Sequence, residues 1–166
     1  MEYCSEIWNP HLIKDINTIE QIQRTFTYKI AGMKHLNYWE RIEALHIMSL
    51  QRRRERKIIL TVWKIKNFFI PNSINLNFKI NKRTDSYKAV LQPMPKVKGR
   101  LLSTFEESFV IKAAKLWNVL PGNLTHIPEL TIFKAALDEY LFTLPDKPPI
   151  LGYPYQTNNS LTSVIK

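Results

Sequence analysis

Residues 49–69 read SLQRRRERKIILTVWKIKNFF, and this stretch decides the expected fold. Ser49 is a favourable N-cap and Pro71 follows the stretch, so the pattern predicts a helix over 50–68. Apolar residues recur at helical spacing along its second half and should face a core: Ile58, Val62, Ile65 and Phe69.

Four more segments have a helical apolar period and are expected to form helices: 12–31, 38–46, 104–119 and 129–142. Asn37 and Glu40 form a capping-box pattern at the start of the second of these. The stripe expected to face inward from the first is Ile16, Ile19, Ile22, Phe26 and Ile30. The last two should bury Phe105, Phe109, Ala113, Leu116 and Leu120, and Leu130, Phe133, Leu137 and Leu141.

Apolar and polar residues alternate over 74–80, which predicts one half-buried strand, and 89–92 is a second extended candidate. The expected fold class is mainly α, with about five amphipathic helices in a small bundle and one or two short strands in a basic connection. Four parts are predicted in order: a basic three-helix subdomain (1–70), the strand and loop connection (71–102), a helix pair (103–142) and a Pro-rich disordered tail (143–166).

The charge is concentrated in the first part of the chain. Its 166 residues carry 24 Lys and Arg against 14 Asp and Glu, and residues 1–100 hold 19 of the former and 8 of the latter. This excess favours a polyanionic partner, nucleic acid before an anionic membrane, while the alternative is a solvated surface. With no long apolar run, no signal-peptide pattern and one cysteine, we expect an intracellular protein, nuclear or cytoplasmic, with no membrane partner.

Cations crowd the first two turns of the helix over 50–68: Arg52, Arg53, Arg54, Arg56 and Lys57. Positive charge at a helix N-terminus is mildly unfavourable, so an external phosphate would explain the cluster. The connection that follows could add further contacts through Lys82, Arg83, Lys88, Lys96, Lys98 and Arg100. The alternatives are a solvated face screened by salt, or a basic amphipathic helix that binds a membrane or calmodulin.

Catalytic and metal-binding patterns are missing from the sequence. None of the four Asp residues forms an adjacent acidic pair on a hairpin, and the four His residues are scattered. Neither a His-Glu-x-x-His nor a Cys-x-x-Cys motif occurs. Only four glycines are present, which excludes a glycine-rich phosphate loop. We therefore predict no catalytic residue, no metal ligand and no cofactor for this chain.

Several motifs in fixed order resemble one family. YCSEIWNP over 3–10, GMKHLNYWER over 32–41, LHIMSL over 45–50 and AKLWNVLP over 114–121 are similar to segments of non-LTR, LINE-like (jockey/CR1-type) retrotransposon polyproteins. The matched segments lie just downstream of the reverse transcriptase catalytic core. The resemblance covers about residues 2–142.

The resemblance implies a thumb-like helical extension that grips template and product. The metal-binding aspartates of that family lie upstream, so the magnesium would belong to the parent polymerase and not to this chain. The implied function is a non-catalytic fragment that contacts the backbone of RNA or of an RNA–DNA duplex, with the missing polymerase core as a second partner. The alternatives are a helical protein-interaction module and a non-functional relic of a mobile element.

Overall fold

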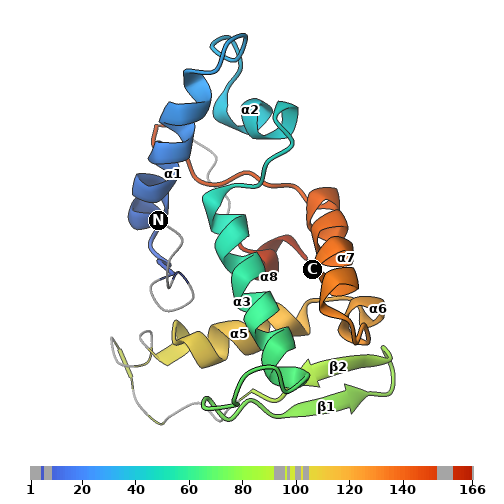
Figure 1. The fold of residues 1–166 in the computed structure, drawn as a ribbon. Coiled ribbons are helices and arrows are strands. Elements are labelled where there is room, and N and C mark those ends of the chain that lie inside the picture. Colours follow the sequence, from blue (N-terminus) through green and yellow to red (C-terminus); the bar gives the residue numbers. More distant parts are fainter. Residues whose placement is uncertain are drawn as a thin grey trace. The chain divides into compact units, whose positions relative to one another are not determined.

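The computed structural model describes residues 5, 9–91, 96, 98–99, 102, 105–152 and 159–165. The fold is mainly helical with one two-stranded antiparallel sheet, which confirms the predicted fold class (Figure 1). Its helices are α1 (Ile13–Tyr28), α2 (Tyr38–Ala44), α3 (Leu50–Lys66), α5 (Phe109–Asn118), α6 (Gly122–Thr125), α7 (Leu130–Thr143) and α8 (Leu161–Val164). The strands are β1 (Phe78–Asn81) and β2 (Ser86–Ala89).

The chain divides into two compact units. Unit 1 comprises residues 1–55 and 141–166, and unit 2 comprises residues 56–140. Helices α3 and α7 therefore each supply residues to both units. This division differs from the four predicted segments because the end of the chain belongs to the same unit as its first 55 residues.

Helix α1 buries its polar side, which contradicts the prediction for its apolar stripe. Ile16 is buried, but Ile22 and Phe26 are 53% and 68% exposed. The side chains that face the interior of unit 1 are Ile16, Asn17, Glu20, Gln23 and Thr27. The polar side is buried because it finds hydrogen-bond partners there; Gln23, for example, donates to the Met48 carbonyl at 3.0 Å.

Helix α2 begins with the predicted capping box. The Asn37 side chain accepts from the Glu40 amide at 3.0 Å, and the Glu40 side chain accepts from the Asn37 amide at 2.7 Å. Tyr38 and Ile42 of this helix pack with Ile150 in a buried cluster of unit 1.

Several described residues of the C-terminal segment 143–166, for which the sequence predicts disorder, are buried. Ile150, Asn159 and Leu161 are buried, and α8 forms near the end of the chain. The Leu151 amide donates to the Asn17 side chain at 3.1 Å. Leu151 and Ile150 thus have partners far away in the sequence. Residues 153–158 of the tail lie outside the described residues.

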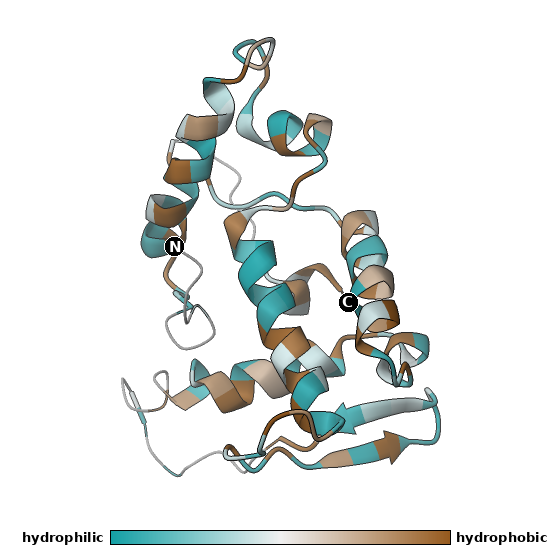
Figure 2. Cartoon of the chain, viewed as in Figure 1, coloured by the Kyte–Doolittle hydropathy of each residue, from teal (hydrophilic) through white to brown (hydrophobic). Residues whose placement is uncertain are grey.

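Helix α3 begins after Ser49, as predicted, and its hydrophilic start gives way to apolar residues further along (Figure 2). Ile58, Val62 and Ile65 are buried as expected. Phe69, the last residue of the predicted stripe, is 63% exposed because the helix ends at Lys66.

Unit 2 is built around two fully buried tryptophans. The Trp63 indole donates to the Ile127 carbonyl at 2.9 Å and stacks on Phe133, and the Trp117 indole donates to the Tyr87 carbonyl at 2.8 Å. Of the inward stripe predicted for α7, Phe133, Leu137 and Leu141 are buried, and Leu130 is half-buried.

The connection between α3 and α5 contains a β-hairpin. Strand β1 pairs with β2 in antiparallel register, with Phe78 opposite Ala89 and Asn81 opposite Ser86. Both strands lie within a few residues of the predicted positions, 74–80 and 89–92. Among the described residues, no helix combines the length and the hydropathy needed to cross a bilayer.

Candidate nucleic-acid interface

The N-terminus of α3, where the sequence suggested a bound phosphate, is occupied by the chain's own acids. The Gln51 amide donates to a Glu20 carboxylate oxygen at 2.6 Å. Asp146 accepts from both the amide and the hydroxyl of Ser49, each at 2.7 Å. These carboxylates supply the negative charge and the hydrogen-bond acceptors that a helix N-terminus favours. They therefore take the role that an external phosphate was predicted to have.

Arg52 is fully buried within unit 1. Its guanidinium donates to the Pro145 carbonyl at 2.9 Å and to the Asn159 carbonyl at 3.3 Å, and its Nε lies 3.9 Å from Asp146. Arg54 is 2% exposed. Neither guanidinium can reach a phosphate from this position, which corrects the prediction for these two residues. Burial of a charged group requires internal partners, and for Arg52 these are Pro145, Asp146 and Asn159.

The other cations at the start of α3 are more accessible. Arg56 forms a two-pronged ion pair with Asp138, in which Nη2 lies 2.7 Å from Oδ2. Arg53 is exposed and Lys57 is half-buried. Of the five cations predicted to contact phosphate, Arg52 and Arg54 are therefore buried. Arg56 is paired with a carboxylate, and Arg53 and Lys57 are the two that remain at the surface.

Glu20 lies at the centre of the buried polar network of unit 1. The Tyr38 hydroxyl donates to its carboxylate at 2.6 Å. Burial raises the pKa of Glu20 above its ordinary value, although hydrogen bonds from Tyr38, Gln51 and Leu50 act in the opposite direction. Burial and the adjacent carboxylate also raise the pKa of Tyr38. This network joins α1, α2 and the start of α3.

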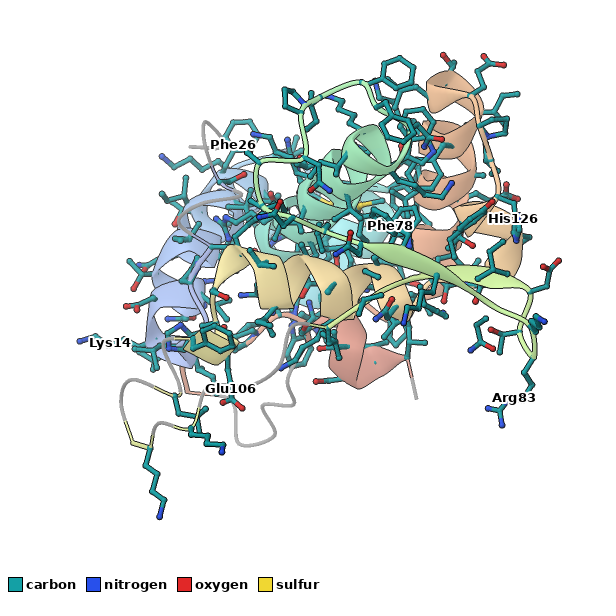
Figure 3. All side chains as sticks on the ribbon, turned by 90° about the horizontal axis from the view of Figure 1, so that it is seen from below. Lys14, Phe26, Phe78, Arg83, Glu106 and His126 are labelled. Atoms are coloured by element: carbon teal, nitrogen blue, oxygen red, sulfur yellow. The ribbon has the colours of Figure 1, made fainter. Side chains whose placement is uncertain are left out.

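In unit 2, the turn of the hairpin presents two adjacent cations. Lys82 and Arg83 are both exposed, and Figure 3 shows the Arg83 side chain extending away from the ribbon. The acid of the same turn, Asp85, lies 3.5 Å from the His126 ring. Within the described residues, neither the Lys82 nor the Arg83 side chain has an acidic partner.

Contacts with α6 hold this turn in place. A Cβ atom added to Gly122 would lie 2.3 Å from the Asp85 carbonyl oxygen, so only glycine permits this approach. The Thr125 hydroxyl accepts from the Tyr87 amide at 3.1 Å, and a His126 ring nitrogen lies 3.1 Å from the Asp85 carbonyl oxygen. The two cations are therefore presented by an anchored turn.

Lys88 of β2 has a structural role instead of the predicted contact with nucleic acid. Its ammonium donates to the carbonyls of Asn118 and Leu120, at 2.5 and 3.2 Å, at the end of α5. Cations are favourable at a helix C-terminus. Burial lowers the pKa of Lys88. Of the other predicted contacts, Lys96 and Lys98 are exposed, and Arg100 lies outside the described residues.

Three aromatic residues that could stack on bases, Tyr38, Trp39 and Tyr87, are engaged within the fold. Tyr38 is buried, and the Trp39 indole donates to the Pro148 carbonyl at 2.9 Å. The ring of Tyr87 lies 4.0 Å from the ammonium of Lys66. Sequence reasoning missed Phe68, which is 93% exposed. The sequence signal that could have identified Phe68 is that no glycine stands where α3 ends, although glycine is the favoured residue there.

The described residues contain no group of three or more His, Cys, Asp or Glu side chains that could hold a metal ion. Comparisons of the chain with protein-family models, with curated proteins and with solved structures found no match.

Proposed function

We propose that the chain binds the sugar–phosphate backbone of RNA or of an RNA–DNA duplex through the exposed cations of unit 2. The observation that carries this proposal is the anchored hairpin turn with its two exposed cations, Lys82 and Arg83. The sequence of unit 2 has 14 Lys and Arg against 6 Asp and Glu, whereas that of unit 1 has 10 against 8. The positive field that attracts a polyanion therefore belongs mainly to residues 56–140.

Several other cations of unit 2 are exposed and could extend the contact: Lys79, Lys96, Lys98, Lys115 and Lys134. Contacts of this kind position a nucleic acid but read no bases, so binding should depend little on sequence. The proposal includes no catalytic step. It agrees with the resemblance to the region downstream of a reverse transcriptase core, in which chemistry and magnesium would belong to the parent polymerase and that core would be a second partner.

The test is binding of a blunt RNA–DNA duplex by fluorescence anisotropy at a series of salt concentrations. The logarithm of the association constant should fall linearly with the logarithm of salt concentration, by about 0.9 per phosphate contact. The double variant Lys82→Ala/Arg83→Ala should bind more weakly and reduce the slope by about 1.8. A control with the same loss of charge is Lys14→Ala/Lys29→Ala, at exposed positions of unit 1. If both double variants had the same salt slope, the hairpin turn would not be part of the binding surface.

A second candidate function, a helical protein-interaction module, is favoured by α1. Its side chains Ile22 and Phe26, one helical turn apart, are 53% and 68% exposed. An exposed apolar face of this kind is typical of a docking surface for another protein. Binding through this face should change little with salt, whereas binding through phosphate contacts should weaken steeply.

A further inference from the structure

The end of α3 has a complete C-terminal capping motif. The Phe68 amide donates to the Ile65 carbonyl at 3.2 Å, and the Phe69 amide donates to the Lys64 carbonyl at 2.9 Å. The Phe69 ring packs on Trp63, with 5.3 Å between ring centroids. These two hydrogen bonds and this apolar contact define a Schellman motif. Phe68 occupies the position that follows the cap.

That position normally belongs to glycine. The backbone of Phe68 is left-handed, with φ of +61°, a conformation that is strained for a residue with a Cβ atom. His46 occupies the same position after the end of α2, with φ of +50°. The His46 ring stacks on Phe142 at 4.1 Å, so packing offsets the strain there.

No such packing covers Phe68. Its side chain is 93% exposed, the most exposed large hydrophobic residue among those the structure describes. A strained backbone and an aromatic ring in water are both unfavourable in the free chain. A strained non-glycine residue whose side chain gains no packing in return is a candidate functional residue.

We propose that Phe68 is a stacking platform for an unpaired base of single-stranded RNA or DNA. Lys64 lies one helical turn before Phe68, and unit 2 carries the charge excess of the chain. A cationic surface with a protruding aromatic ring is the combination that single-stranded nucleic acids require, since phosphates pair with the cations and a base stacks on the ring. The two capping hydrogen bonds close the turn that carries Phe68, and the adjacent Phe69 ring contacts Trp63.

This inference rests on the proposed function and adds to it a second kind of substrate. Exposed cations alone should bind a blunt duplex and a single strand by the same backbone contacts. A stacking platform adds affinity only where an unpaired base is available, because bases in a duplex are already stacked. The inference therefore predicts that Phe68 matters for single strands and for duplexes with overhangs, and not for blunt duplexes.

The test compares oligouridine, oligothymidine and a blunt RNA–DNA duplex, each with the full chain and three variants. Phe68→Gly should weaken binding of single strands about tenfold and should leave the salt slope and the blunt duplex unchanged. Phe68→Leu keeps an apolar side chain but has no ring, so its binding of single strands should be weakened to a similar extent. Phe68→Tyr should bind as the unaltered chain does. Loss with one sugar only would assign the site to RNA or to DNA.

Glycine is the favoured residue at this backbone position, so Phe68→Gly should unfold at no lower temperature than the unaltered chain. The matched control is Phe26→Ala, which removes an exposed ring from unit 1 and should not affect single strands. If the duplex shows the expected salt slope but Phe68→Gly binds single strands normally, the stacking inference alone fails. If the duplex is not bound, the proposed function fails and the inference fails with it. Loss of binding to anionic lipid vesicles, with single strands unaffected, would overturn it in favour of a membrane contact.

Discussion

Two basic regions that look alike in sequence have opposite environments in the fold. The start of α3 and the turn between β1 and β2 each carry adjacent cations, Arg52 to Arg54 in one and Lys82 with Arg83 in the other. Arg52 and Arg54 are buried, whereas both cations of the turn are exposed. Density of positive charge along a sequence therefore does not determine whether the charges face a ligand or the interior.

What separates the two regions is the set of acceptors that the fold brings to them. Asp146, with the carbonyls of Pro145 and Asn159, reaches Arg52 from more than 90 residues away along the chain. At the hairpin turn, the nearby acid Asp85 faces His126 instead. Substitutions in and around the two regions should therefore have different effects on stability and on binding.

Arg52→Ala should lower the free energy of unfolding by about 3 kcal/mol, because it removes the buried ionic partner of Asp146 and the donor to the Pro145 and Asn159 carbonyls. The control is the neighbouring Arg53→Ala, which removes the same charge from an exposed position and should change stability by less than about 0.5 kcal/mol. Urea unfolding followed by circular dichroism measures both. If both variants were equally stable and Arg52→Ala no longer bound nucleic acid, Arg52 would be a phosphate contact and not a structural residue.

Gly122→Ala should cost about 2 kcal/mol, since the new methyl group would overlap the backbone of Asp85 and displace the hairpin turn. It should also weaken binding of an RNA–DNA duplex although every cation is retained, because the turn is no longer held. Asn123→Ala, at the exposed neighbouring position, should do neither. Thermal unfolding and anisotropy together would show whether anchoring of the turn matters. Normal duplex binding by a destabilised Gly122→Ala would separate the turn from the interface.

Glu20→Gln should change how stability depends on pH. Because burial raises the pKa of Glu20, the folded chain binds more protons than the unfolded chain between the ordinary and the raised pKa. The free energy of unfolding should therefore fall as pH rises through that window, and the glutamine variant should lack this decrease. Unfolding in urea from about pH 4 to about pH 7 should show the unaltered chain losing stability relative to the variant. The exposed Glu43→Gln serves as the control, and a difference of opposite sign would contradict the assignment.

Asp138→Asn should have the smallest effect on stability, about 0.5 kcal/mol, because its ion pair with Arg56 is partly exposed. Removal of Asp138 releases Arg56 for an external phosphate, so duplex binding should become slightly tighter and its salt slope steeper. Glu139→Gln makes the same change in net charge without releasing an arginine. Identical slopes for the two variants would mean that Arg56 takes no part in binding.

Short-range features of the fold could be predicted from sequence. The capping box of Asn37 and Glu40 and the Ser49 start of α3 depend on residues within three or four positions, so their patterns are visible in the chain. The helical period located α7 to within about one residue. The short helices α6 and α8 were missed because four residues are too few to show a period.

Features that depend on distant partners could not be predicted. The apolar stripe of α1 faces outward because Glu20 and Gln23 find partners around residues 38–51, which no pattern within α1 reveals. Lys88 resembles any other cation of the basic connection until the end of α5 is placed against it. At the candidate site, the sequence therefore shows where cations are frequent but not which of them are exposed.

The most direct test of the account is the reactivity of each arginine toward phenylglyoxal in the folded chain, measured by mass spectrometry with and without an RNA–DNA duplex. Arg83 should react in the free chain and be protected by the duplex, while Arg52 and Arg54 should not react in either sample. Reaction of Arg52 in the free chain together with its protection by the duplex would contradict the account.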